Sequence, residues 1–163
     1  MKNRAVVFLA FFVGISVSLS AFGSSYDYVN VFNERHTISI QTSPAWFVVG
    51  DRAVDANICD QSASFVCVTS DSFNFAVPVA RKPDVLKWDY KGHSYVLKNQ
   101  GTLEALGHRI KVWRIESTQG VQKFRYLFAE KEGLLAISIE VGADSQTFIS
   151  RRAAGFGAQI SGK

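Results

Sequence analysis

The sequence contains few of the features that mark an enzyme. It has no Gly-x-Ser-x-Gly nucleophile elbow, no Walker-type phosphate loop and no closely spaced pair of histidines. Its three histidines, His36, His93 and His108, are far apart in the chain, and the segment 155–160 lacks the third glycine of a dinucleotide-binding loop. We therefore expect a protein that binds a partner rather than one that catalyses a reaction, with no cofactor and no metal.

Cysteine is also scarce. The only two are Cys59 and Cys67, and they do not form the Cys-x-x-Cys motif that is typical of thiol redox sites. In an exported chain a close pair of cysteines indicates a structural disulfide. The spacing suits two strands joined by a tight loop at 62–64, and closing so short a ring stabilises the fold by roughly 2.5 kcal/mol.

Only the first residues form a long hydrophobic run. Residues 1–4 are polar and basic, residues 5–19 are apolar, and residues 20–23 are mostly small. This pattern is typical of a secretory signal peptide, and we expect residues 1–23 to be removed so that Ser24 becomes the N-terminus. The alternative is an uncleaved anchor, but glycine and serine interrupt the apolar segment, and a spanning helix needs about 20 strongly apolar residues. No later stretch predicts a membrane segment, so the mature protein is expected in the periplasm or outside the cell.

The charge of the mature chain gives little support for binding to nucleic acid. The full chain has 18 basic and 14 acidic residues, a formal net charge of +4. Removal of the leader takes Lys2 and Arg4 away, so 16 basic residues face 14 acidic ones and the net charge falls to +2. We therefore expect the partner to be a protein or a component of the cell envelope, and not nucleic acid.

Short strands separated by turn residues fill the mature sequence. Turn signals recur about every 8–12 residues and no helical periodicity is evident. The sequence predicts one all-β domain, residues 24–152, in which about nine or ten short strands form a single antiparallel sheet that curls into a barrel, half-barrel or sandwich. Residues 153–163 are small and Gly-rich, so a flexible tail is expected there.

Three further segments carry specific expectations. Ala45–Val49 is the most continuous apolar run of the mature chain. It indicates a strand buried on both faces, a strand leading into a loop that covers the core or, alternatively, an apolar contact surface. Residues 50–57 are polar and predict a loop or a short helical turn. Residues 99–101 predict a turn, and residues 102–106 predict at most one helical turn before the next strand.

The last third of the chain predicts three consecutive antiparallel strands, at 108–116, 121–129 and 134–141. Aromatic and basic side chains alternate along the second strand, so one face of the sheet is apolar and the other is charged. A loop at 130–133 predicts the following cross-strand pairs: Ala129 with Leu134, Phe128 with Leu135, Tyr126 with Ile137, Phe124 with Ile139 and Lys123 with Glu140.

The first hairpin of this meander is expected to turn at 117–120. Trp113 and Ile115 then share the apolar face, and Arg114, Lys123 and Arg125 gather on the opposite face. These three cations are the candidate surface for an anionic partner. The alternative is an ordinary solvated face that Glu116 and Glu140 partly neutralise.

The residues of this meander carry a resemblance. Segments 115–117, 124–128 and 131–136 are similar to hairpins of small exported bacterial β-proteins, and they loosely resemble the strand pairs of the LolA-like half-barrels, which carry lipoproteins through the periplasm. The resemblance implies a half-barrel, and we transfer no functional residue from it. Our first hypothesis is an exported binding domain. The second is a carrier of an apolar ligand or lipid in a barrel-like cavity, and the third is an enzyme or metal site that uses His93 and His108 with Asp89 or Glu104.

Overall fold

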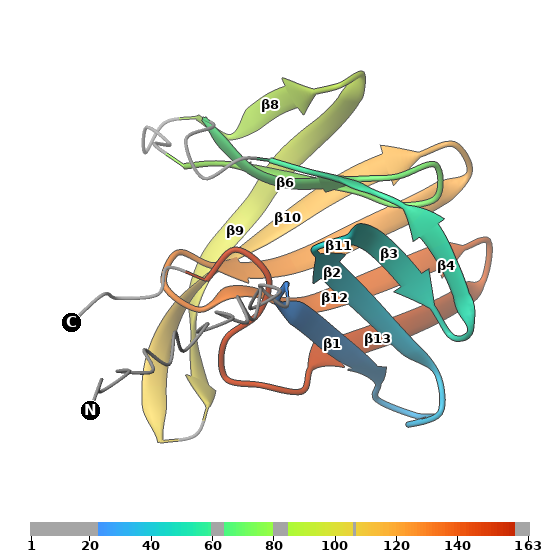
Figure 1. Cartoon of the computed structure of the whole chain (residues 1–163). Helices are drawn as coiled ribbons and strands as arrows, with labels where there is room; N and C mark the ends of the chain where they lie inside the picture. The colour runs from blue at the N-terminus through green and yellow to red at the C-terminus, as the bar shows by residue number, and fades with distance from the viewer. Residues whose placement is uncertain (1–22, 60–63, 80–84, 106, 159–163) are drawn as a thin grey trace, which may run out of the picture.

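The structure is a computed structural model that describes residues 23–59, 64–79, 85–105 and 107–158 (Figure 1). The described residues form thirteen strands and contain no helix that is long and apolar enough to cross a membrane. The expected all-β antiparallel fold is confirmed, but thirteen strands form two sheets where the sequence predicts about nine or ten strands in one. Residues 1–22 of the predicted leader, 1–23, lie outside the described residues.

Ten strands form one large sheet in the order β4-β3-β2-β1-β13-β12-β11-β10-β9-β8. Their bounds are β1 (Ser25–Asn30), β2 (Thr37–Thr42), β3 (Ala45–Val49), β4 (Arg52–Asp55), β8 (Lys87–Tyr90), β9 (His93–Ala105), β10 (His108–Gln119), β11 (Gln122–Ala129), β12 (Gly133–Val141) and β13 (Asp144–Ser150). The sheet does not close into a barrel, because β4 and β8 are its two edges. Pairing of β1 with β13 joins the strands from the start of the described chain to those from its end.

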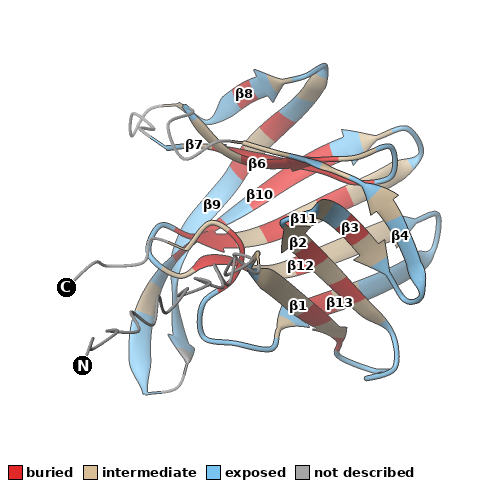
Figure 2. Cartoon of the chain, in the orientation of Figure 1, coloured by how far each residue is buried: buried red, intermediate tan, exposed pale blue. Residues whose placement is uncertain are grey.

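The other three strands form a small second sheet that the large sheet curls around (Figure 1). They are β5 (Asn57–Ile58), β6 (Phe65–Thr69) and β7 (Asn74–Pro78). Buried residues concentrate where the two sheets meet (Figure 2). Phe73 stacks on Phe47 with ring centroids 4.4 Å apart, and Phe75 lies 5.0 Å from the ring of Tyr126. Aromatic side chains of β7 and of the turn before it therefore fill the concave side of the large sheet where the two sheets meet.

Strand β7 is an edge of the small sheet, and side chains of the large sheet complete its hydrogen bonding. The side-chain oxygen of Gln119 accepts from the Asn74 N–H at 3.1 Å, while Gln119 Nε2 donates to the Asn74 carbonyl at 2.6 Å. The Tyr126 hydroxyl donates to the same carbonyl at 2.6 Å, and Trp88 Nε1 donates to the Ala76 carbonyl at 2.9 Å. Burial raises the pKa of Tyr126 well above its ordinary value, so this donor keeps its proton. Buried backbone groups need such partners.

The predicted register of the second hairpin is correct along most of its length. Three predicted pairs are confirmed: Tyr126 with Ile137, Phe124 with Ile139 and Lys123 with Glu140. Near the loop the prediction is wrong by one residue, since Phe128 lies opposite Leu134 and Ala129 lies opposite Gly133. A β-bulge takes up the extra residue, Leu135. It allows Leu134 to be fully buried although an unbroken alternation would turn it to the other face.

The first hairpin turns later than the sequence indicates. Strand β10 runs on to Gln119, which pairs with Gln122, so the turn is the two-residue loop Gly120–Val121. Gly120 has φ +60°, which glycine adopts without the penalty that other residues incur. The predicted faces are nevertheless correct, because Ile115 lies opposite Tyr126 in the core and Glu116 lies opposite Arg125 on the other side.

The expectations for 50–57 and 99–105 are wrong, and residue 106 lies outside the described residues. Arg52–Asp55 and Asn57–Ile58 are strands rather than a loop. No turn interrupts β9, which continues to Ala105 and pairs with β10 as a long hairpin. The end of this hairpin, residues 99–105 of β9 and 108–112 of β10, extends beyond the neighbouring strands (Figure 1), and we call it the arm.

The structure also corrects the expectations for 45–49 and for the C-terminal segment. The run Ala45–Val49 is not buried on both faces, because Phe47 is buried while Trp46 is 39% exposed. The expectation of a flexible tail is wrong for 153–158, because Phe156 packs in the core and its N–H donates to the Tyr28 hydroxyl at 3.0 Å. A Cβ at Gly155 would lie 1.8 Å from the Leu134 carbonyl oxygen, so only glycine allows the chain to pass so closely. Residues 159–163 lie outside the described residues.

Candidate functional site

Strands β10 and β11 bring the three predicted cations together on the convex face of the large sheet, around the side chain of Glu116. Arg125 Nε lies 3.3 Å and Arg114 Nη2 lies 3.5 Å from one carboxylate oxygen. Lys123 Nζ lies 3.4 Å from the other oxygen. Because each of these residues is on the face opposite the core, their side chains remain between 37% and 51% exposed.

A fourth cation, Lys98 on β9, completes this group, with its Nζ 3.6 Å from Glu116. Sequence reasoning missed Lys98 because it placed a turn directly after this residue. The register of β9 against β10 shifts between Arg114 and Ile115, and this irregularity leaves Lys98 without a directly opposed residue. The alternation of the strand alone does not reveal such a shift.

We call the group of six charged residues the convex-face cluster. Its members are Lys98, Arg114, Glu116, Lys123, Arg125 and Glu140. Arg125 also pairs with Glu140, so four cations face two carboxylates and the net charge of the cluster is +2. Glu116 is 8% exposed. Burial alone would raise its pKa, but the hydrogen bond from Lys123 and the surrounding cations hold it below the ordinary value of 4.5.

The convex-face cluster has two physical consequences. Glu116 stays ionised at neutral pH and draws four flexible side chains toward one point, so they lose less conformational freedom when an anion arrives. At the same time the two carboxylates compete with any such anion. Exposed ion pairs of this kind add little stability each, roughly 0–1 kcal/mol.

The remaining basic residues of β10, Arg109 and Lys111, lie on the other face of the strand. They share the concave side of the arm with Trp113, because residues two apart in a strand point the same way. These side chains line an open groove of about 590 Å³. Its other lining residues are Gln100, Ile110, Glu130, Lys131 and Glu132.

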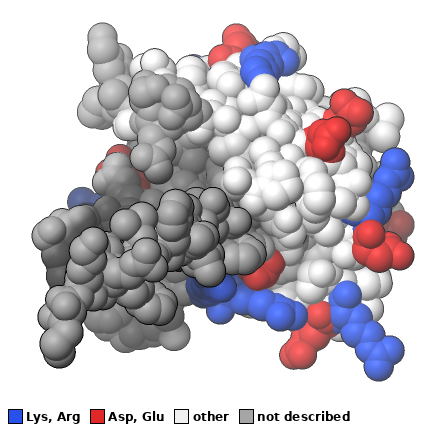
Figure 3. Space-filling view, in the orientation of Figure 1, with Lys and Arg blue, Asp and Glu red and all other residues white. Residues whose placement is uncertain are grey.

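A smaller pocket of about 130 Å³ adjoins this groove and shares Trp113 and Glu130 with it. Its remaining described lining is Val66, Pro78, Val79, Phe128 and Gly157. The basic residues of β10 and β11 are thus divided between two faces, with Arg109 and Lys111 on one and Arg114, Lys123 and Arg125 on the other. On the side viewed in Figure 3, charged side chains lie mainly toward the margins of the described surface.

The structure separates the two histidines of the third hypothesis. His93 begins β9, whereas His108 pairs with Ala105 at the other end of the same strand. Twelve residues of extended chain span about 40 Å, so His93 and His108 cannot share a metal or a substrate. The Asp89 carboxylate already accepts a hydrogen bond from Ser94. Across the described residues, no group of three or more His, Cys, Asp or Glu side chains is arranged to hold a metal ion.

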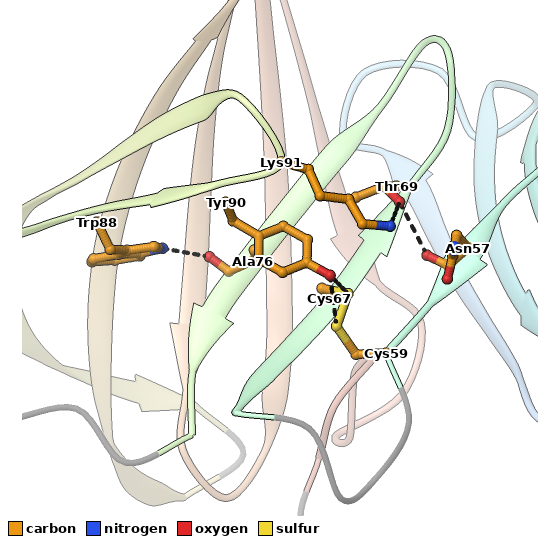
Figure 4. Close-up of a disulfide and its surroundings, with 8 residues drawn as sticks. All are labelled: Asn57, Cys59, Cys67, Thr69, Ala76, Trp88, Tyr90 and Lys91. Carbon is orange, nitrogen blue, oxygen red and sulfur yellow. Dashed lines mark hydrogen bonds between the residues drawn. A yellow bond between two sulfur atoms is a disulfide. The ribbon is translucent and has the colours of Figure 1, made fainter.

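Cys59 and Cys67 form a disulfide between the end of β5 and strand β6, with Cα atoms 5.1 Å apart (Figure 4). The Tyr90 hydroxyl, from β8, lies 3.2 Å from Cys59 Sγ and 3.1 Å from Cys67 Sγ. The disulfide therefore holds the small sheet together at the point where β8 packs against it. Such a bond is typical of proteins in oxidising compartments. Most of the predicted loop at 62–64 lies outside the described residues.

The chain matches no protein-family model, no curated protein and no solved structure. The likeness of its hairpins to those of the LolA-like half-barrels stays a prediction.

Proposed function

We propose that this protein is an exported binding domain without catalytic activity, whose convex-face cluster contacts an anionic surface of a protein or cell-envelope component. The observation that carries the proposal is the group of four partly exposed cations around Glu116, with a net charge of +2. The leader-like sequence at 1–23 and the disulfide support export.

The carrier hypothesis receives less support. Phe73 and Phe75 of the small sheet pack against the aromatic residues of the large sheet, so the concave side is filled where the two sheets meet. The larger groove lies outside this core and is lined mostly by charged and polar residues. A lipid chain would find little apolar surface there, so its transfer from water would gain little free energy.

Binding of the mature chain, residues 24–163, to anionic material tests the proposal. The probe is a vesicle of phosphatidylcholine with or without phosphatidylglycerol, together with immobilised polyglutamate as a model of an acidic protein. We expect binding to the anionic forms only, and we expect it to weaken as NaCl rises from about 50 to about 300 mM. The probe that binds more tightly indicates which kind of partner is used.

A matched pair of triple variants separates the cluster from net charge. Arg114→Gln, Lys123→Gln and Arg125→Gln together should weaken binding by about tenfold or more. Removing the exposed cations Arg35, Arg52 and Arg152 by the same substitutions changes the charge equally and should weaken binding less than about twofold. Equal losses for both triple variants would contradict the proposal.

A further inference from the structure

Among the described residues, no strand lies next to the outer edge of β9 along the arm. Strand β8 covers only His93 to Val96, and the last backbone hydrogen bond on that side runs from the Leu97 N–H to the Leu86 carbonyl at 2.8 Å. From Asn99 to Ala105, the only described strand that pairs with β9 is β10. Alternate N–H and C=O groups of an antiparallel strand point away from its partner, so this edge presents donors and acceptors.

This edge is long and accessible. Every residue from Lys98 to Glu104 is exposed, and the segment contains no proline. Eight residues, from Lys98 to Ala105, span about 26 Å. Protected edges are usually short or bent, or carry proline or charges that prevent pairing. Here the only charged side chains are Lys98 and Glu104, which lie near the two ends.

The concave side of the arm determines which side chains a new strand should carry. Lys111 lies directly opposite Thr102, and Arg109 lies directly opposite Glu104. Both cations are exposed, and the short Thr102 side chain leaves Lys111 room to reach across β9. The acidic residues of the groove, Glu130 and Glu132, belong to the β11–β12 turn on the other side of β10. Glu104 shares this face with Arg109, so together with Lys111 they give the side nearest the β9 edge a net charge of +1. Glu130, Lys131 and Glu132 give the far side a net charge of −1. The side nearest the β9 edge is therefore the more basic one.

We infer that an extended polypeptide segment with acidic side chains at alternate positions adds as a strand to the outer edge of β9, from Lys98 to Ala105. Its acidic side chains lie over Lys111 and Arg109, and its backbone pairs with β9. A second copy of this chain is a poorer occupant, because its own β9 edge supplies Glu104 as the only acidic residue. This site is separate from the convex-face cluster and goes beyond the proposed function.

The test uses the mature chain and a fluorescein-labelled eight-residue peptide of alternating glutamate and valine, with binding followed by fluorescence anisotropy. The matched peptide has lysine in place of glutamate, and we expect it to bind at least about tenfold more weakly. Two further peptides are N-methylated on alternate residues, one at the glutamates and the other at the valines. An added strand uses the N–H groups of alternate residues only, so one methylated peptide should bind and the other should not.

Variants of the chain locate the binding site. Arg109→Gln with Lys111→Gln should weaken peptide binding about tenfold, whereas Lys123→Gln with Arg125→Gln, the same change of charge on the convex face, should weaken it less than about twofold. In hydrogen exchange, amides within 98–105 should slow when the peptide binds. Because the Lys123 and Arg125 variant reports on the convex-face cluster, failure of one site is distinguished from failure of the other.

Four results would overturn the inference. The first is peptide binding without protection of 98–105, and the second is equal binding of both N-methylated peptides. The third is a concentration-dependent dimer that protects 98–105 in the absence of peptide, which would assign the edge to a second copy of the chain. Absence of any peptide binding would likewise reject the acidic strand as its occupant.

Discussion

The two halves of β10 show how the covering of a sheet decides the character of its face. Along 113–119, concave-facing Trp113, Ile115 and Ser117 are buried at the junction with the small sheet. Along 108–111, the residues of the same face are Arg109 and Lys111, and both are exposed. The strand keeps its alternation throughout, so only the presence of a second layer differs between the two halves.

The opposite face of β10 is charged in the half that belongs to the body of the sheet and apolar in the arm. In the body of the sheet it carries the charged residues Arg114 and Glu116, whereas in the arm it carries Ile110 and Val112. The body therefore owes its stability to the interface of two sheets, while the arm depends on one hairpin. A two-stranded hairpin alone is only marginally stable in water. The comparison predicts that stability is concentrated in the body and that the arm is free to serve binding.

The largest effect should come from shortening an aromatic side chain in the body. Phe75 is fully buried, and Phe75→Ala should lower the free energy of unfolding by about 3–5 kcal/mol because it leaves a cavity. Leu103→Ala in the arm, where Leu103 is 36% exposed, should lower it by less than about 0.5 kcal/mol. Urea denaturation of both variants measures the difference. Similar losses would mean that the arm is as firmly packed as the body.

A milder variant keeps this comparison measurable if Phe75→Ala does not fold. Phe75→Leu retains most of the buried apolar volume and should cost about 1–2 kcal/mol. Its hydrogen-exchange pattern should show faster exchange in β6 and β7 and unchanged exchange in the arm. Faster exchange confined to the arm would contradict the assignment of the core.

Loss of the disulfide should have the next largest effect. Replacing Cys59 and Cys67 by serine removes a constraint on the unfolded chain and should cost about 2–3 kcal/mol. The effect should appear in the small sheet, and binding of peptides to the arm should persist at temperatures where the variant stays folded. Tyr90→Phe is the control, since it removes the hydroxyl beside the two sulfur atoms and should cost less than about 1 kcal/mol.

The hydrogen bonds that Gln119 makes with the β7 edge provide a third test. Gln119→Leu leaves the Asn74 N–H without its partner and should cost about 1–3 kcal/mol. Its cross-strand neighbour Gln122 makes the control, because Gln122→Leu removes the same amide group from a residue whose side chain makes no hydrogen bond with the described residues of β7. Chemical denaturation of the two variants should differ by at least about 1 kcal/mol. Equal stability would show that water replaces Gln119 at this edge.

Much of this fold follows from local sequence pattern, and what does not follow depends on contacts between distant segments. Alternation along 122–129 correctly assigns the faces of β11 and the burial of Tyr126. The bulge at Leu135 and the position of Lys98 depend on how two strands accommodate an extra residue. Phe156 looks like part of a tail because glycine and alanine surround it, yet it enters the core through contacts with Tyr28.

The candidate site shows the same division. Pattern alone places Arg114, Lys123 and Arg125 on one face, and the structure brings their side chains around Glu116 as a single group. The sequence does not predict the groove beside the arm, because the composition around Gly101 predicts a turn there. Pairing with β10 keeps these residues extended, and that pairing comes from the partner strand rather than from local preference.

The smallest expected effect concerns Glu116 and depends on pH. The pKa of this carboxylate lies below 4.5 in the folded protein, so its ion pairs stabilise the fold above about pH 4.5. This contribution is lost as the pH falls through the folded pKa, because the carboxylate is then protonated. Glu116→Gln should therefore cost about 1 kcal/mol at pH 7 and less at about pH 3, measured by urea denaturation at both values.

The control for Glu116 is Glu104→Gln in the arm, which removes one exposed carboxylate and should change stability by less than about 0.5 kcal/mol at pH 7. If Glu116→Gln costs the same at both pH values, the lost stability comes from packing and not from the ion pairs. If it stabilises the protein at pH 7, the cost of burying the charge exceeds its attraction to the four cations. In that case the cations are held together at the expense of stability, which would strengthen the argument that their arrangement serves binding.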